Sequence, residues 1–204
     1  MPAGVPLNPD RILAATEEIL RRHGPAKATV VDVSRALGVS HAAVYKHFAS
    51  KQALREAVTR RWLNQNRDTL AAIAHDTALP PPQRLRTWLM AVLTVKQTKI
   101  REDPELFAAY GALAAAHSSV AAEHIADLLH QLEVIVAAGA SDGSFACGDP
   151  AATARTVFHA TARFNHIAHA SEWQNPGIGT ELDEVCTLLL EGLKAPVSRP
   201  NPSR

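Results

Sequence analysis

Apolar side chains recur every three or four positions along most of this chain, and residues that start or stop helices separate the recurrences. Residues 12–20 repeat in this way between Asn8-Pro9-Asp10, which is typical of a helix start, and Gly24-Pro25, which is typical of a helix end. The sequence has no alternating strand pattern and no internal repeat. The pattern therefore predicts an all-α protein.

Three hydroxyl side chains are expected to cap the next three helices. Thr29, Ser40 and Ser50 each precede a short apolar period. The helix after Thr29 is short because Gly38 ends it. The helix after Ser40 is short because its apolar period stops at Phe48. The third is expected to run to about residue 76.

The run Leu79-Pro80-Pro81-Pro82 is the strongest internal break, because proline lacks an amide donor and clashes with the preceding helical turn. Beyond it the periodicity predicts helices over about 83–101, from 103, over 119–138, over 149–170 and over 180–193. Residues from 195 onward hold three prolines and no apolar period, which predicts a loose tail.

Composition fits a globular protein, and charge is unevenly distributed. The 204 residues are 47% hydrophobic and 20% charged. Residues 1–70 hold 11 of the 21 Lys and Arg side chains but 6 of the 20 Asp and Glu, so this segment carries +5 and the rest carries −4. A basic N-terminal third suits a polyanionic partner, although so small a bias also arises on ordinary solvated surfaces.

Several classes of protein are disfavoured. We expect no membrane partner and no secretory signal, because apolar runs stay short and the first residues lack the required pattern. Cys147 and Cys186 lack metal-site spacing, so a reducing, cytoplasmic location is expected. No nucleophile elbow, phosphate-binding glycine loop or paired catalytic base occurs, so we expect a non-enzyme without a cofactor.

Residues 29–48 hold the segment with the most specific chemistry. Two short helices are joined by Leu37-Gly38-Val39-Ser40, where Gly38 tolerates the left-handed backbone that the turn needs. Val39 is expected to fill the angle between the helices. His41, Ala42, Tyr45 and Lys46 are then left on the outer face of the second helix, which suits a DNA major groove. An ordinary helical hairpin remains the alternative that this pattern leaves open.

The same residues resemble the signature of the TetR (tetracycline-repressor) family. The resemblance rests on Thr29, on Ala36 to Ser40, on Val44 to Lys51 and on Leu54, and it covers about the first 65 residues. It implies an N-terminal three-helix helix-turn-helix domain over residues 1–55. A long helix would join it to a C-terminal ligand-binding and dimerisation bundle over 56–195, followed by a tail over 196–204.

The resemblance also implies roles for particular side chains. Base edges would face His41, Ala42 and Ala43. Tyr45 would meet the DNA backbone or a thymine methyl group, and phosphates or the backbone would meet Thr29, Ser40, Lys46 and Lys51. His47 completes the DNA-binding set. Val31 departs from the family, where this position is usually polar, so the first helix of the pair is expected to read few bases.

The expected function is that of a transcriptional regulator, with repression as the usual mode. The implied partners are a roughly palindromic double-stranded operator, a second copy of the chain and an unknown small apolar effector. Aromatic residues of the C-terminal part could line the effector pocket, although plain core packing explains most of them individually: Trp88, Phe107, Tyr110, Phe158 and Phe164.

The last two predicted helices are candidates for a dimer interface, because the final helix is apolar around more of its circumference than packing on one side requires. The candidate interface residues are Val157, Thr161, Leu182, Val185, Leu189 and Leu193. If both helices were instead buried within one chain, a charge at Leu189 would unfold the protein.

Ten histidines raise the question of a metal site. His159, His166 and His169 are expected on one helix, but no carboxylate or cysteine spacing completes a ligand set, so no metal is expected. Two other functional classes stay open: an all-helical enzyme or carrier with an apolar cavity, and a helical interaction module that does not bind DNA.

Overall fold

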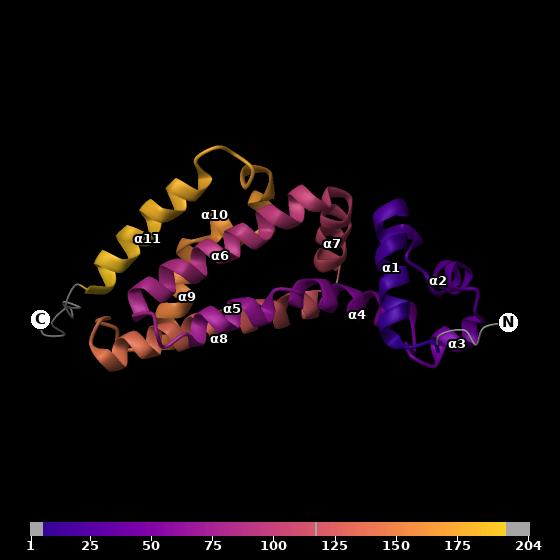
Figure 1. Cartoon of the computed structure of the whole chain (residues 1–204), viewed down its shortest axis with the longest axis horizontal. Coiled ribbons are helices and arrows are strands. Elements are labelled where there is room, and N and C mark those ends of the chain that lie inside the picture. Colours follow the sequence, from indigo (N-terminus) through magenta and orange to yellow (C-terminus); the bar gives the residue numbers. More distant parts are fainter. Residues whose placement is uncertain (1–5, 117, 195–204) are drawn as a thin grey trace, which may run out of the picture. The chain divides into compact units, whose positions relative to one another are not determined.

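The computed structural model describes residues 6–116 and 118–194, and every regular element in those ranges is a helix (Figure 1). The all-α prediction is therefore confirmed, while the expected tail over 196–204 lies outside the described residues. The elements, with η for a 3-10 helix, are α1 (Pro9–His23), η1 (Pro25–Lys27), α2 (Val30–Leu37), α3 (His41–Tyr45), α4 (Lys51–Asn64), α5 (Arg67–His75), α6 (Pro81–Glu102), α7 (Pro104–Ala116), α8 (Ser118–Asp142), α9 (Pro150–Ala160), α10 (Ala162–Asn165), η2 (Ile167–Glu172) and α11 (Ile178–Lys194).

The predicted helix caps are formed at the start of the first four α-helices. Side-chain oxygens of Asn8, Thr29, Ser40 and Ser50 accept a hydrogen bond from the backbone N–H three residues later, at 2.9–3.2 Å. Such a bond satisfies an amide that has no partner inside its helix. Gly38 ends α2 with φ at 65°, which is the left-handed conformation that its sequence position predicts.

The chain packs as two compact units, each made from two stretches of sequence. The head unit comprises residues 6–65 together with the described part of 99–124, and the body unit comprises 66–98 and 125–194. Helices α6 and α8 therefore contribute to both units. This grouping by packing does not follow a single cut at residue 55, because α7 packs with the N-terminal helices.

The core of the head unit is formed by helices α1 to α4. Its buried residues are Ile12, Ile19, Val30, Val33, Val44 and Leu54. Leu37, Val39 and Phe48 are partly buried and pack against it, which agrees with the position predicted for Val39 between the two short helices. Burying a side chain of this size contributes about 1.5–3 kcal/mol, so this core fixes the angle between the two short helices.

Helix α7 is held against α1 and α4 by an aromatic cluster. The rings of Trp62 and Tyr110 stack at 4.5 Å between centroids, and Phe107 meets Trp62 edge-on at 5.8 Å. The ammonium of Lys99 lies 4.1 Å from the centroid of Trp62 and donates to the Trp62 carbonyl at 2.7 Å, which caps the end of α4. Burial, together with the nearby carboxylate of Glu17, raises the pKa of Tyr110 well above its usual value.

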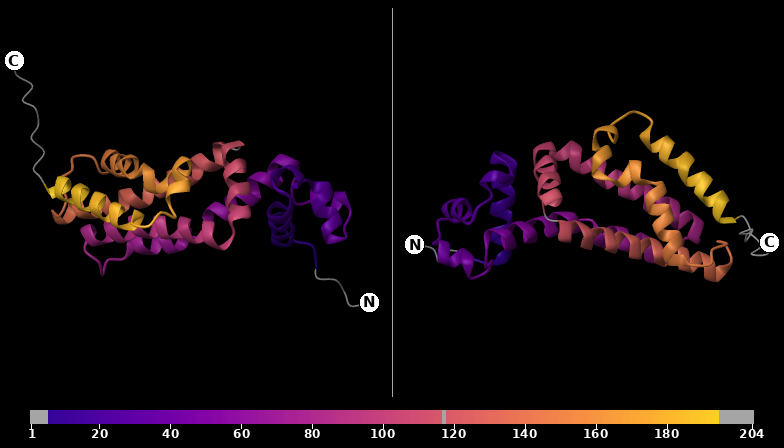
Figure 2. Two further views of the ribbon diagram at one scale, coloured as in Figure 1. Left: turned by 90° about the horizontal axis from the view of Figure 1, so that it is seen from above. Right: turned by 180° about the vertical axis from the view of Figure 1, so that it is seen from behind.

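In the body unit, α5 and α8 are joined by an ion pair between Arg67 and Asp127 at 2.7 Å. The Trp88 indole of α6 donates to the Gln131 side chain of α8 at 3.0 Å, so two buried polar groups satisfy each other. The end of α11 reaches the segment after α8, where the Ala146 amide donates to the Leu193 carbonyl at 2.7 Å. Figure 2 gives two further views of these helices.

Three helices are shorter than the sequence predicts, and the first is α3, which ends at Tyr45 rather than near Phe48. The helix expected to continue to residue 76 divides into α4 and α5, with Gln65 and Asn66 between them. The helix expected over 149–170 ends at Ala160, where the Thr161 hydroxyl donates to the Val157 carbonyl and the Asn165 amide donates to the Phe158 carbonyl. These side-chain bonds use carbonyl groups near the end of the helix, so they compete with its continuation.

Within the ranges 6–116 and 118–194, no helix is both long enough and apolar enough to cross a membrane.

Candidate functional site

The outer face of α3 presents the residues that the sequence placed there. His41, Ala42, Lys46 and Tyr45 are exposed, and half of the Tyr45 surface is accessible to solvent. Val44 lies between them in sequence and is fully buried. A single buried anchor thus fixes the direction in which the neighbouring polar side chains project.

The remaining candidate residues of this face differ in exposure. Ser40 and His47 are exposed, whereas Ala43 is half-buried. The Ser40 hydroxyl accepts from the Ala43 amide, and its own proton is left to donate to a phosphate oxygen. The half-buried position of Ala43 leaves less of it for a base edge than of its neighbour Ala42.

Lys51 is the first residue of α4 and is exposed. The first amides of a helix point outward and carry partial positive charge, so a phosphate near Lys51 would meet an ammonium and a helix N-terminus together. The Ser50 cap takes only the amide of Ala53.

The start of α2 combines a polar and an apolar residue. Thr29 is half-buried, and its hydroxyl is used inside the chain, because it accepts from the Asp32 amide and donates to the Asp32 carboxylate. Val31 is exposed to 43%, which is unusual for a valine of this unit. An exposed apolar side chain beside the α3 segment could contact a thymine methyl group but could not accept or donate a hydrogen bond.

The sequence did not predict the side chain that holds the start of α2 in place. The Arg55 guanidinium of α4 donates to the carbonyl of Pro25 and, at 3.3 Å, to that of Ala28. Both carbonyls belong to the segment that leads into α2, so Arg55 fixes where α2 begins. The sequence indicated this contact only by placing an arginine on the inner side of a predicted helix.

A groove of about 350 Å³ in the head unit was also not predicted. Its lining includes three basic side chains near the junction of α1 and α2, and the full set is Ile19, His23, Lys27, Asp32, Arg35 and Ala36. Lys27 and Arg35 are among the basic residues that the sequence places in residues 1–70.

The five aromatic residues proposed for an effector pocket fall into two groups. Trp88, Phe158 and Phe164 line one cavity in the body unit, which we call the aromatic cavity. Phe107 and Tyr110 instead pack on Trp62 in the head unit. The aromatic cavity measures about 10 Å³, which is room for about one water molecule, and is lined by Trp88, Leu89, Val92, Phe158, Thr161, Phe164, Asn165 and Leu182.

The six residues proposed for a dimer interface also divide. Val157, Thr161 and Leu182 are at most 2% exposed, so they pack inside the single chain. Val185, Leu189 and Leu193 are half-buried. The most exposed apolar residue of α11 is Leu188 at 73%, which is not one of the six proposed residues.

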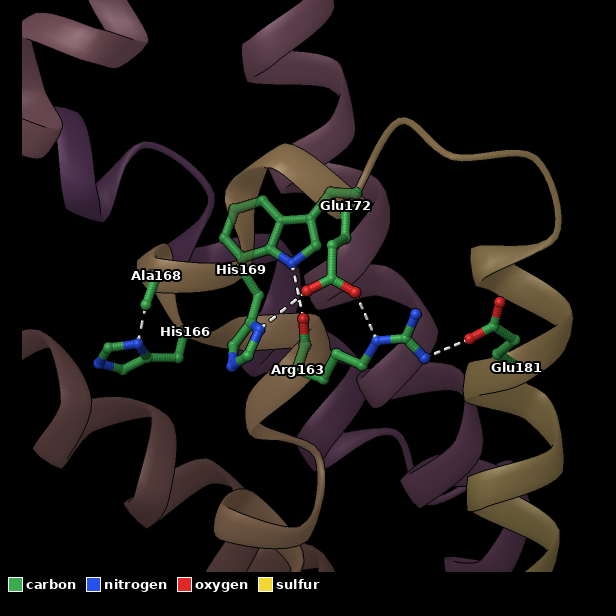
Figure 3. A network of polar contacts seen from close by, with 7 residues as sticks. Arg163, His166, Ala168, His169, Glu172 and Glu181 are labelled. Carbon is green, nitrogen blue, oxygen red and sulfur yellow. Dashed lines mark hydrogen bonds and ion pairs between the residues drawn. The ribbon is translucent and has the colours of Figure 1, made fainter.

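The histidines do not share the helix that the sequence predicted for them. His159 lies in α9, whereas His166 and His169 follow the break after Ala160 (Figure 3). The Nδ1 atom of His166 accepts from the Ala168 amide at 3.3 Å, and that of His169 pairs with Glu172 at 3.0 Å. The rings of His166 and His169 thus each have a local polar contact, and no cluster of three or more metal-ligating side chains occurs among the described residues.

Cys186 lies on the buried face of α11. Burial raises the pKa of its thiol to about 11, because the charged thiolate is disfavoured away from water. This cysteine therefore behaves as a small apolar side chain.

Two family models match the chain. Residues 12–58 match the model described as bacterial regulatory proteins, tetR family, and residues 81–186 match the model described as tetracyclin repressor-like, C-terminal domain. The second match alone spans more than half of the chain.

Sequence relatives and solved structures agree with these matches. An uncharacterised HTH-type transcriptional regulator of Mycobacterium tuberculosis is 31% identical over 100 residues, which are 48% of this chain and 46% of that protein. An HTH-type transcriptional repressor of the same species is 31% identical over 100 residues, 47% of this chain and 52% of that protein. The matched segment thus spans about half the length of these curated relatives.

The fold itself is similar to that of SmeT, the repressor of the Stenotrophomonas maltophilia multidrug efflux pump SmeDEF. The TM-score is 0.63 at 22% identity, and the match covers 97% of this chain and 98% of SmeT. SmeT is also known in a complex with triclosan. The helix-turn-helix unit and the helical bundle are therefore an architecture found in solved structures.

Proposed function

This chain belongs to the TetR family of bacterial regulatory proteins, and on that premise we propose that it is a DNA-binding transcriptional repressor that a small-molecule effector releases. The observation that carries the proposal is the exposed face of α3. His41, Tyr45 and Lys46 project from it around the buried anchor Val44.

The side chains of this face have complementary roles in the proposed complex. Imidazole and hydroxyl groups can exchange hydrogen bonds with base edges, and His41 is the residue we assign to base reading. Lys46 and Lys51 supply the positive charge that phosphates attract, while His47 lies beside them. Ala42 is small enough to let the helix approach the floor of the groove.

A single head offers only a small contact with DNA, so we propose a homodimer on a roughly palindromic operator. Its interface would use the outer face of α11, where Leu188 is exposed and Val185 and Leu189 are half-buried. In a two-fold dimer this patch meets its own copy. Because a regulator of this kind has to reach the chromosome, we propose a cytoplasmic location.

Release by an effector requires a ligand that binds two states of the dimer with different affinity. We propose the body unit as the effector-binding part, with the aromatic cavity as its starting point. The cavity is too small for an organic molecule as it stands, so binding must displace its walls. That displacement supplies the difference between the free and bound states.

The proposal is tested by selecting operator sites from randomised double-stranded DNA and measuring retardation of the selected site at several salt concentrations. We expect a two-fold symmetric consensus, and log affinity should fall with log salt by about 0.9 per phosphate contact. If no sequence is enriched and affinity barely depends on salt, the chain is not a sequence-specific DNA-binding protein.

A further inference from the structure

Lys96 lies in an unusual environment on α6. It follows Val92 of the aromatic cavity by four residues and therefore lies one turn along the same face of the helix. Its ammonium lies 5.2 Å from the centroid of Trp173, which is completely buried. Within the described part of the chain, that ammonium has no hydrogen bond and no ion pair.

A partly buried ammonium without an anion is unfavourable. Burial lowers the pKa of Lys96 to about 8, because the charged form loses hydration that no carboxylate replaces. The face of an indole attracts a cation but compensates for only part of that loss. Any anion that reached Lys96 would therefore gain binding energy in an environment where water competes weakly.

The acidic residues of the segment around Trp173 are already engaged by another cation. Arg163 pairs with Glu172 at 2.7 Å and also with Glu181, as Figure 3 shows. The carboxylate of Glu172 accepts from His169 as well. These contacts leave the positive charge of Lys96 without a counter-charge from this segment.

The ammonium and the aromatic cavity are joined by two elements. Along α6, Val92 lines the cavity and Lys96 comes one turn later. Phe164 also lines the cavity, and the carbonyl of its neighbour Arg163 accepts from the Trp173 indole at 2.8 Å. The Lys96 ammonium therefore lies one helical turn along α6 from the wall of the aromatic cavity.

We propose that Lys96 anchors an anionic ligand, and that this ligand is an amphipathic organic acid. Its carboxylate lies on the Lys96 ammonium, and its apolar body enters between Trp88, Phe158 and Phe164. The wall that yields is the segment from Thr161 to Trp173, because it consists of two short helical pieces rather than one continuous helix. That the ligand is the effector rests on the function proposed above; that Lys96 binds it does not.

The test measures binding of hexanoate, octanoate and decanoate to the whole protein by titration calorimetry, next to the alcohols of equal chain length. For the wild-type protein we expect each carboxylate to bind about tenfold or more tightly than its alcohol, the range for a hydrogen bond to a charged group. Affinity should also rise with chain length as more apolar surface is buried. In Lys96→Met, the preference for the acid should disappear while the alcohols bind as before.

Two further variants separate charge from packing. Lys96→Arg keeps the cation and should retain the preference for carboxylates. Lys194→Met removes an exposed ammonium of the same unit, which pairs with Glu191 at 2.8 Å, and should change nothing. Circular dichroism of each variant verifies that it is folded.

The proposal is overturned if no carboxylate binds the wild-type protein, or if Lys96→Met prefers acids over alcohols as strongly as the wild type does. Binding to the selected operator is measured in parallel with the same preparations. Operator binding without carboxylate binding refutes this inference alone, and carboxylate binding without operator binding refutes the proposed function alone.

Discussion

At the scale of single residues, the exposed side chains of the head unit differ in the kind of information they can carry. A lysine at a helix start recognises charge, whereas an imidazole on the recognition face can recognise one base edge. Lys51 and His41 are both exposed and are ten residues apart, so they allow these two roles to be tested separately.

Lys51→Ala should weaken binding to all DNA sequences by a similar factor and flatten the salt slope by about one unit, because a phosphate contact carries no base information. Fluorescence anisotropy with specific and unrelated duplexes at several salt concentrations measures both quantities. An unchanged slope with unchanged affinity would remove Lys51 from the interface.

Substitution of His41 by Ala should instead change the base preferred at one operator position and cost about 1–3 kcal/mol at that position. Selection from randomised sites, repeated with the variant, measures the preferred base at each operator position. The same consensus from both proteins would show that His41 does not take part in base reading.

Lys96 gives a prediction on pH, since its pKa is about 8 when folded and 10.5 when unfolded. Below about pH 8 both states hold the proton, and the charge destabilises the fold. As pH rises from about 8 to 10.5, the unfolded state binds more protons, so the wild-type protein should gain stability relative to Lys96→Met.

Urea unfolding of the two proteins at about pH 7 and about pH 10 measures this difference, and other titrating groups cancel in the comparison. Lys96→Met should be the more stable protein at the lower pH. A difference in stability that does not change with pH would mean that Lys96 is not destabilised by burial.

At the scale of elements, a helix depends on what its neighbours leave room for. Gly139 lies inside α8, where glycine normally costs about 1 kcal/mol relative to alanine. A Cβ atom at Gly139 would lie 2.1 Å from the Cδ2 atom of the buried Phe145 ring. The Phe145 amide also donates a hydrogen bond to the Gly139 carbonyl. The glycine therefore lets the chain turn back across α8.

Gly139→Ala should destabilise the protein by about 1–3 kcal/mol, because the buried ring has to move. Helix propensity alone would predict the opposite, since alanine favours a helix more than glycine does. Gly179→Ala in α11 is the control, since its added methyl would meet only Met90, at 3.9 Å. Thermal unfolding should show a lower midpoint for the first variant only. Equal midpoints would mean that Phe145 repacks without cost.

At the scale of the whole molecule, the decisive question is whether the exposed face of α11 holds two copies together. Leu188 is 73% exposed, and Leu190, two residues later, is 8% exposed. A charge at Leu188 therefore tests the proposed interface, whereas a charge at Leu190 tests the core of the single chain. The sequence analysis considered a charge at Leu189. This residue is half-buried, so such a charge would affect both the proposed interface and the core of the single chain.

Leu188→Glu should yield folded monomers that no longer retard the operator, because the charge would have to be buried in the interface. Leu190→Glu should unfold the chain instead. Light scattering and circular dichroism on both variants distinguish these outcomes. A wild-type monomer at micromolar concentration, or a dimer unaffected by Leu188→Glu, would refute the proposed interface.

The sequence by itself determined the helical class, the helix-turn-helix segment and its inner and outer faces. These features are local: a cap such as Ser40 accepts a hydrogen bond from an amide three residues away, Gly38 needs only its own backbone, and helical spacing turns Tyr45 away from the inward direction of Val44. Information of this kind is present within ten to twenty consecutive residues.

Tertiary structure alone decided which distant side chains meet. It placed Tyr110 on Trp62 in the head unit, left Trp88 with Phe164 at the aromatic cavity, and brought Lys96 to Trp173 without a carboxylate. The apolar pattern shows that an aromatic residue is buried but not against which partner. That choice depends on packing between segments far apart in the sequence, where small differences in contact area and desolvation select one arrangement.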